Sequence, residues 1–154
     1  MELNLAKLAA TESIRTLKFR YAQLCDEGYD PDLLSSLFTH DAVWLREGDR
    51  PCSGRARIRD FFAGSAKRIE WALHYMMNPA IEVDDDLKTA RGQWLLLQPA
   101  SFRTTAGTEA VWITGKYEDI YRMVGGKWFF ASVKLALHSA TPYDQGWVKQ
   151  RFRS

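Results

Sequence analysis

One histidine lies where an imidazole needs a partner. His74 is the only side chain in the segment 71–76 that ionises near neutral pH. On a strand, alternation places it on one face with Ala72, Met76 and Asn78. It is either a core histidine that bonds a backbone carbonyl, as buried polar groups normally do, or a general base whose tautomer a carboxylate fixes.

A carboxylate at the end of the first predicted helix is the second candidate. Asp26 lies in the last turn before Gly28, where the helix dipole disfavours a negative side chain. Either something else favours Asp26 there, or it belongs to a solvated acidic corner with Glu27, Asp30 and Asp32.

A tyrosine one turn earlier is the third candidate. Tyr21 shares a helix face with Leu17 and Cys25, so its ring is expected inside and its hydroxyl then needs a partner. It is either a core residue or a catalytic hydroxyl. On an ideal helix Tyr21 and Asp26 point about 140° apart. Both line one pocket only if the last turn unwinds or the pocket mouth wraps around the helix end.

Further residues are candidates for contacting a ligand. Four aromatic side chains form either core or the walls of a pocket for a flat, ring-bearing ligand: Trp44, Trp94, Trp112 and Tyr117. Lys134 and His138 alternate on one face of the last predicted strand, with Phe130 and Ser132. Lys134 either reaches solvent, as long basic side chains usually do, or faces the ligand.

Composition excludes several classes of function. The net charge of +2 is spread along the chain, which argues against nucleic-acid and anionic-membrane partners. Three separated histidines without HxH or HExxH spacing argue against a metal site. No glycine-rich phosphate loop is present, so no cofactor is expected, and the acidic run 84–86 indicates a hairpin turn. With no signal-like or spanning segment and two isolated cysteines, a soluble cytoplasmic protein is expected.

The elements that position these residues change in period along the chain. Helical spacing is expected over 5–25, in a short helix that Asp30 caps before Pro31, and in a third helix after Gly54. A strand is expected over 41–45. Four runs rich in Val, Ile and aromatic residues then predict an antiparallel meander: 71–83, 89–98, 111–123 and 127–138. Turns are expected at 84–86, 103–108 and 125–126.

Three helices followed by a curved meander indicate an α+β fold, with the helices packed on one face of a mixed, mostly antiparallel sheet. The length of 154 residues predicts a single domain. The aromatic tail 139–154, with Tyr143, Trp147 and Phe152, is expected to pack on the sheet or on a neighbouring subunit.

The order of these elements resembles the SnoaL-like family of the nuclear transport factor two superfamily of cone-shaped α+β barrels. The resemblance is carried by the segments 14–21, 37–44 and 54–62, by Asn78-Pro79, and by the hairpin 126–128. Within the family the chain is similar to the branch that contains bile acid 7α-dehydratase, scytalone dehydratase and hexachlorocyclohexane dehydrochlorinase.

That resemblance implies roles for the candidates. Asp26 and His74 match the branch's carboxylate and histidine, Tyr21 matches a tyrosine five residues before the carboxylate, and a basic residue is implied on the last strand. We expect Asp26 and His74 to lie within hydrogen-bond reach at the floor of the largest pocket. The resemblance also implies a homo-oligomer, a trimer or a dimer.

The implied function is a cofactor-independent, dehydratase-like lyase that acts on a hydrophobic cyclic small molecule. Two alternatives remain open. One is an isomerase or polyketide cyclase that starts with the same proton abstraction. The other is a non-catalytic ligand-binding or oxygenase β-subunit-like module, because a shared fold does not settle function.

Overall fold

A computed structural model describes residues 1–154. The elements in chain order are α1 (Glu2–Asp26), α2 (Pro31–Ser36), β1 (Phe38–Arg46), β2 (Cys52–Ser53), α3 (Arg55–Arg68), β3 (Ile69–Ala72), β4 (Tyr75–Val83), β5 (Thr89–Thr104), β6 (Gly107–Val124), β7 (Lys127–Pro142) and α4 (Gly146–Lys149). No helix is both long and apolar enough to cross a membrane.

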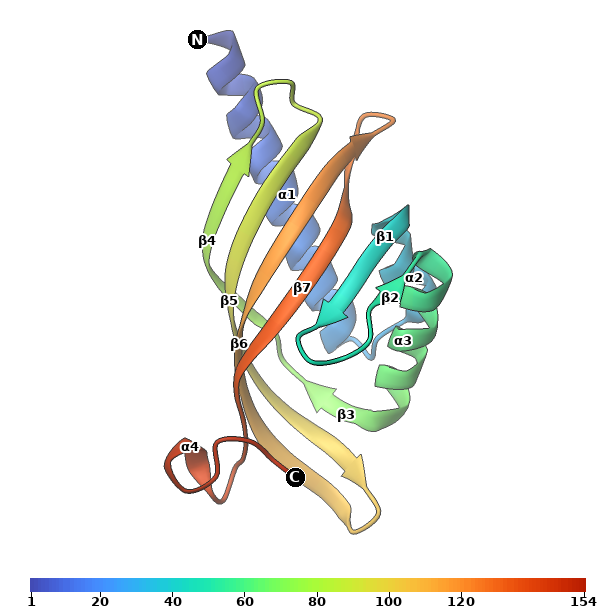
Figure 1. The fold of residues 1–154 in the computed structure, drawn as a ribbon, viewed down its shortest axis with the longest axis vertical. Helices are drawn as coiled ribbons and strands as arrows, with labels where there is room; N and C mark the ends of the chain where they lie inside the picture. Colours follow the sequence, from blue (N-terminus) through green and yellow to red (C-terminus); the bar gives the residue numbers. More distant parts are fainter.

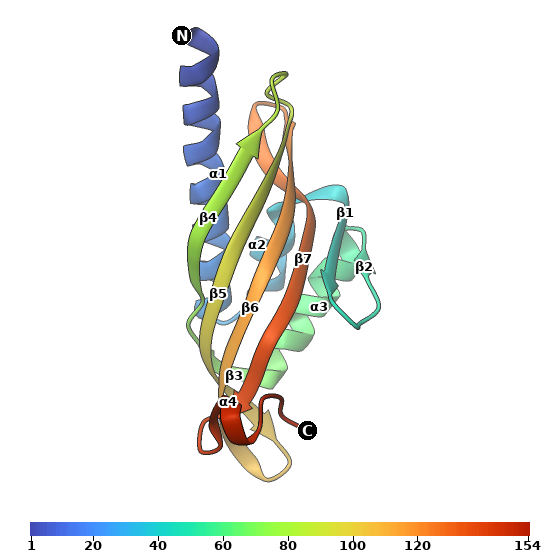
Figure 2. The same cartoon turned by 60° about the vertical axis from the view of Figure 1, so that its left-hand side comes forward.

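All seven strands form one bent sheet. Its order is β2-β1-β7-β6-β5-β3, and β4 also pairs with β5. Every pairing is antiparallel except that of β1 with β7. The long strands β5, β6 and β7 run almost the length of the molecule, with α1 along one face and α2 and α3 beside β1 (Figures 1 and 2). The predicted α+β cone with a mixed, mostly antiparallel sheet is confirmed.

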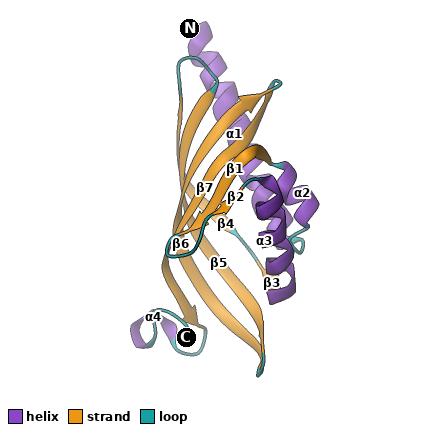
Figure 3. Ribbon diagram, turned by 45° about the vertical axis from the view of Figure 1, so that its right-hand side comes forward, coloured by secondary structure: helices purple, strands orange, loops and turns teal.

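Helices α2 and α3 begin where the sequence predicts, whereas α1 begins three residues earlier than predicted, at Glu2. The Asp30 side chain accepts hydrogen bonds from the backbone N–H groups of Asp32 and Leu33 at 3.0 and 2.9 Å, and Pro31 occupies the first turn of α2. Gly54, with φ of 87°, precedes α3. Coloured by secondary structure, the three longer helices gather on one side of the sheet (Figure 3).

The end of α1 is a Schellman motif. The N–H of Tyr29 bonds the carbonyl of Leu24 at 3.0 Å, and the N–H of Gly28 bonds that of Cys25 at 3.3 Å. Gly28 has φ of 106° and Tyr29 has φ of 61°, so both residues are left-handed. This pair of bonds turns the chain back over the helix end. Asp26 therefore stays helical while Tyr29 returns beside it.

The predicted strand 71–83 is wrong in one respect, because it is two strands, β3 and β4, separated at Leu73 and His74. Leu73 bonds the carbonyl of Pro99 on β5 at 3.1 Å. Pro99 has no N–H to return, so regular pairing stops there. The N–H of His74 instead bonds the side chain of Asp26 at 2.9 Å. The break thereby attaches the sheet to the end of α1.

The hairpin between β5 and β6 is longer than predicted. Pairing continues to Thr104 and Gly107, so only Thr105 and Ala106 form the turn, where a turn over 103–108 is expected from the sequence. Polar side chains there reflect solvent exposure rather than a loop.

The C-terminal tail folds back on β7. The N–H of Ala140 bonds the carbonyl of Arg151 at 2.9 Å, and the N–H of Arg153 bonds that of Ala140 at 2.7 Å. The expected packing on the sheet is therefore seen for the backbone. The aromatic side chains of the tail, Tyr143, Trp147 and Phe152, stay at least half exposed.

Candidate active site

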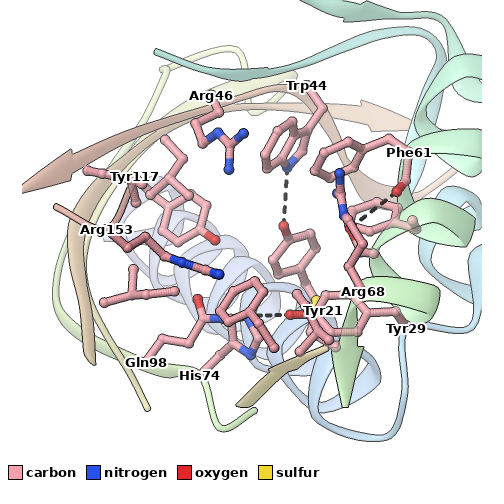
Figure 4. A pocket seen from close by; sticks show the side chains of 18 residues that line it. Tyr21, Tyr29, Trp44, Arg46, Phe61, Arg68, His74, Gln98, Tyr117 and Arg153 are labelled. Atoms are coloured by element: carbon pink, nitrogen blue, oxygen red, sulfur yellow. Dashed lines mark hydrogen bonds between the residues drawn. The ribbon is translucent and has the colours of Figure 1, made fainter. Parts of the chain in front are cut away.

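A cavity of about 250 Å³ lies between the C-terminal end of α1, helix α3 and the inner face of the sheet. Of the 18 residues that line it, 12 are hydrophobic. The close-up shows their side chains converging on this space, with His74 and Tyr29 at one side and Trp44 at another (Figure 4). A mostly apolar cavity with a few convergent polar groups is the usual form of a small-molecule site.

Asp26 and His74 meet as expected. The carboxylate oxygen Oδ1 of Asp26 lies 2.7 Å from Nδ1 of His74. The same oxygen accepts the backbone N–H of His74 at 2.9 Å. The His74 side chain is 4% exposed and that of Asp26 25%, so Asp26 is not part of a solvated acidic corner.

This contact fixes the imidazole. An ionised carboxylate only accepts, so Nδ1 of His74 carries the proton that the 2.7 Å contact needs. The other ring nitrogen, Nε2, then has a lone pair. Because His74 lines the cavity and Asp26 does not, the carboxylate lies behind the ring and the ring faces the cavity. Such an arrangement suits a general base.

Tyr29 is absent from the residues that the sequence predicts for the site. Its hydroxyl lies 3.1 Å from Nε2 of His74, and the two rings meet edge-on at 5.8 Å. Burial raises the pKa of Tyr29 well above its usual value, so the hydroxyl keeps its proton and donates to Nε2. The signal in the sequence is an aromatic residue directly after the glycine that ends α1, since that position packs back on its helix.

Tyr21 also lines the cavity, 2% exposed. Its hydroxyl accepts the indole N–H of Trp44 at 3.2 Å, and it also bonds the Tyr117 side chain. Burial raises the pKa of Tyr21 well above its usual value, so the hydroxyl keeps its proton. The helix does not unwind: Tyr21, Cys25 and Tyr29 line the cavity, and His74 bridges the angle between Tyr21 and Asp26.

Two of the four predicted aromatic contacts lie at the cavity. Trp44 stacks on Phe61 with ring centroids 4.1 Å apart, and both line it together with Tyr117. Trp94 and Trp112 do not line it, so these two predictions are wrong. Trp94 is fully buried farther along the sheet, where it donates to the Tyr121 hydroxyl at 3.0 Å.

Trp112 is excluded by strand alternation. It lies between Val111 and Ile113, whose side chains are buried, and Ile113 lines the cavity. Trp112 therefore points to the opposite face of the sheet. Trp112 and Tyr117 are an odd number of residues apart on the same strand, so only one of their side chains can face the cavity.

The predicted ligand contacts of Lys134 and His138 are wrong as well. In the pairing of β6 with β7, Ile120 faces Ser132 but Tyr121 faces Phe130, so Ala131 is an extra residue on β7. This β-bulge reverses the alternation beyond it. Leu135 and Leu137 consequently line the cavity, while Lys134 takes the outer face. His138 is itself a second extra residue on β7, because Thr114 faces Ser139 and Gly115 faces Leu137, and it is exposed.

Three arginines that the sequence does not predict for the site also line the cavity: Arg46, Arg68 and Arg153. They come from the end of β1, the end of α3 and the tail. Nothing in their local spacing indicates a common site, because only the fold brings these segments together.

The cavity is not the largest hollow of the protein, contrary to expectation. An open groove of about 570 Å³ runs along α1 beside the hairpin of β6 and β7. It is lined by small or apolar side chains, with Lys127 as its one charged residue. No group of three or more His, Cys, Asp or Glu side chains lies close enough together to hold a metal ion.

A second charged pair lies deeper in the sheet. Nζ of Lys18 is 2.8 Å from Oδ2 of Asp119, and both side chains are 0% exposed. Burial lowers the pKa of Lys18 and raises that of Asp119, since desolvation opposes both charges. Tyr121 donates to the same carboxylate at 2.8 Å. Neither charged residue lines the cavity.

The fold and the sequence agree on a family. The SnoaL-like domain family matches residues 6–134. The chain belongs to this family. The matched range contains the Asp26–His74 pair and Tyr29, while Arg153 lies outside it. No sequence among the curated proteins matches this SnoaL-like chain.

Solved structures support the same fold. A protein proposed to be a scytalone dehydratase, from Novosphingobium aromaticivorans, superposes with a TM-score of 0.79 at 20% identity, over 91% of each chain. Hexachlorocyclohexane dehydrochlorinase LinA-type3 from Novosphingobium barchaimii gives 0.79 at 23% identity, over 90% of this chain and 93% of that one. An NTF2-like protein with a cystatin-like fold, also from N. aromaticivorans, gives 0.68 at 22%, over 88% and 86%.

Proposed function

We propose that this SnoaL-like protein is a cofactor-independent lyase that eliminates water, or another leaving group, from a hydrophobic cyclic substrate. The observation that carries the proposal is the 2.7 Å contact from Asp26 to Nδ1 of His74, a residue that lines the cavity and whose other ring nitrogen contacts the Tyr29 hydroxyl. The names of the similar structures, a dehydratase and a dehydrochlorinase, support an elimination.

In this mechanism His74 removes a proton from the carbon beside the breaking bond. The C–H electrons form the new double bond, the leaving group departs with its own electron pair, and Nε2 receives the proton. Asp26 keeps Nδ1 protonated and stabilises the imidazolium that forms. General-base action of this kind accelerates a reaction by about 10²- to 10⁴-fold.

The two tyrosines supply hydrogen bonds. The Tyr29 hydroxyl bonds Nε2 at 3.1 Å, so a substrate C–H has to displace it to reach this nitrogen. The hydroxyl is then beside the departing oxygen and donates to it. Tyr21, whose oxygen already accepts from Trp44, donates to a substrate carbonyl and so favours the enolate-like transition state.

The test is elimination from a panel of cyclic β-hydroxy ketones, followed by the absorbance of the conjugated enone. We expect His74→Ala to lower turnover by at least about 100-fold with ligand affinity largely kept. His138→Ala is the matched control, since this exposed histidine is outside the cavity. Equal turnover by wild type and His74→Ala would remove His74 as the base.

The same panel separates the alternatives. Double-bond migration or ring closure without loss of water would indicate an isomerase or cyclase. Binding without turnover across the panel would favour a ligand-binding module.

A further inference from the structure

The charges at the cavity are all of one sign. Arg46, Arg68 and Arg153 line it, and no Asp or Glu does. Figure 4 shows the three guanidinium groups directed toward the same space. The catalytic proposal uses none of them, because a neutral ring substrate needs only the histidine and the two tyrosines.

Two of these arginines already have partners. Arg46 pairs with Asp49 at 2.6 Å, and Arg153 pairs with Glu109 while its guanidinium carbon lies 4.6 Å from the Phe102 ring centre. Both acids lie outside the lining. Arg46 and Arg153 therefore keep their positions without a ligand, and they add positive potential to the cavity.

Arg68 has no such partner. The hydrogen bonds and salt bridges of the protein include none from its side chain, and the residue is exposed, so its guanidinium meets solvent as well as the cavity. As the last residue of α3 it complements the helix C-terminus, which accounts for a cation there but not for one that lines a cavity. Its charge also acts to lower the pKa of Tyr29 against the larger effect of burial, so it lies near the residue that contacts His74.

An apolar ligand that covered the Arg68 guanidinium would remove water from it without supplying a hydrogen-bond partner, which is unfavourable. A ligand with an apolar ring and an oxyanion fits both halves of the lining. Its ring packs on the stacked Trp44 and Phe61, and its oxyanion meets Arg68.

We propose that the substrate carries a carboxylate beside its hydrophobic ring and that Arg68 binds this group at the cavity. Guanidinium matches a carboxylate with two parallel hydrogen bonds, which gives orientation as well as affinity. The Arg68 contact would then fix which ring carbon faces His74. Because it names a property of the lyase substrate, the inference rests on the proposed function.

The test is calorimetric binding of unreactive ligands: 2-naphthoate, the neutral 2-naphthalenemethanol and 2-naphthalenesulfonate. Wild type is expected to bind 2-naphthoate at least about tenfold more tightly than the alcohol, and more tightly than the sulfonate. This preference is expected to shrink as salt rises from about 0.05 to 0.5 M.

Variants locate the effect. Arg68→Gln is expected to weaken 2-naphthoate about tenfold while the alcohol stays within about twofold, and Arg68→Lys to fall between. The matched control is Arg91→Gln. Arg91 is exposed, its guanidinium lies 3.5 Å from the Glu82 carboxylate, and it does not line the cavity. Thermal unfolding verifies that each variant is folded.

Equal affinity for 2-naphthoate and the alcohol in wild type would overturn the inference, as would an equal loss of both ligands in Arg68→Gln or the same loss in Arg91→Gln. Preference for the sulfonate would overturn the choice of a carboxylate. No turnover is measured, so a failed lyase assay and a failed anion preference remain distinguishable.

Discussion

Helix α1 carries one member of each of two pairs, Lys18 with Asp119 and Asp26 with His74, and the two pairs differ in what surrounds them. Lys18 and Asp119 are both 0% exposed, with Tyr121 and the Tyr117 ring against them. Asp26, which bonds His74, lies eight residues after Lys18 on α1, about 12 Å farther along at the usual helical rise. There the ring borders a cavity.

The comparison separates perturbed ionisation from function. Burial shifts the pKa of both Lys18 and Asp119, which is a recognised mark of functional sites. Yet their charges meet only each other and neighbouring side chains, where no substrate reaches them. Access to a cavity, together with a ring nitrogen that borders it, distinguishes the pair of Asp26 and His74.

The largest effect is expected at the sealed pair. Lys18→Met should lower the free energy of unfolding by about 3 to 5 kcal/mol, because it leaves Asp119 charged and buried without its cation. Oδ1 of Asp119 already lacks a hydrogen-bond partner. Urea unfolding measures the change.

Combining Lys18→Met with Asp119→Leu should recover most of this loss, since replacing a buried pair by apolar side chains is often neutral. Losses that simply add in the double variant would show that the two residues are not coupled.

At the cavity pair, Asp26→Asn should lower kcat by at least about 100-fold, because the amide favours the wrong imidazole tautomer. Steady-state kinetics with any substrate found in the panel checks it. The matched control is Asp32→Asn, an exposed acid that bonds Arg59, for which activity should stay within about twofold. A mild effect of Asp26→Asn would indicate that Asp26 only anchors the backbone of His74.

Tyr29→Phe should lower kcat about tenfold with KM nearly unchanged, because it removes one hydrogen bond made in the transition state. Tyr143→Phe, at an exposed tail position, is the control. A faster Tyr29→Phe enzyme would contradict the donor role and indicate that the hydroxyl only obstructs Nε2.

The smallest effect is expected on the alkaline side of the pH profile. Burial raises the pKa of Tyr21 and of Tyr29 well above 10, so both hydroxyls keep their protons where an ordinary tyrosine would lose them. The ratio kcat/KM should therefore stay flat to about pH 10. A decline centred at or below that pH, with circular dichroism unchanged, would rule the two tyrosines out as protected donors.

Much of the fold is predictable from sequence because local signals and tertiary packing agree. The cap at Asp30, the glycine that ends α1 and the alternating second half all specify the elements found. The contact of Asp26 with His74 is predictable only through the family resemblance. Its supporting geometry, a strand break opposite Pro99, depends on pairing between distant segments.

The wrongly predicted ligand contacts also depend on pairing between distant segments. An extra residue at Ala131 turns Lys134 outward, His138 is itself an extra residue farther along β7, and no local composition marks either bulge. Trp112 and Tyr117 are an odd number of residues apart on one strand, so alternation alone predicts that their side chains point to opposite faces of the sheet. Arg68 and Arg153 reach one cavity only through the closure of the tail and α3 on the sheet.

The most direct test of the contrast measures two quantities on two variants. His74→Asn places an amide nitrogen near the position of Nδ1, so it can keep a bond to Asp26, but it has no atom at Nε2; Asp119→Asn perturbs the sealed pair. Deuterium exchange into a cyclic ketone reports proton abstraction, and urea unfolding reports stability. We predict that the exchange rate of His74→Asn falls by at least about 100-fold while its free energy of unfolding stays within about 1 kcal/mol of the wild-type value. Asp119→Asn is predicted to lose stability, while its folded fraction exchanges at the wild-type rate. Wild-type exchange rates in His74→Asn would contradict the assignment of His74 as the base.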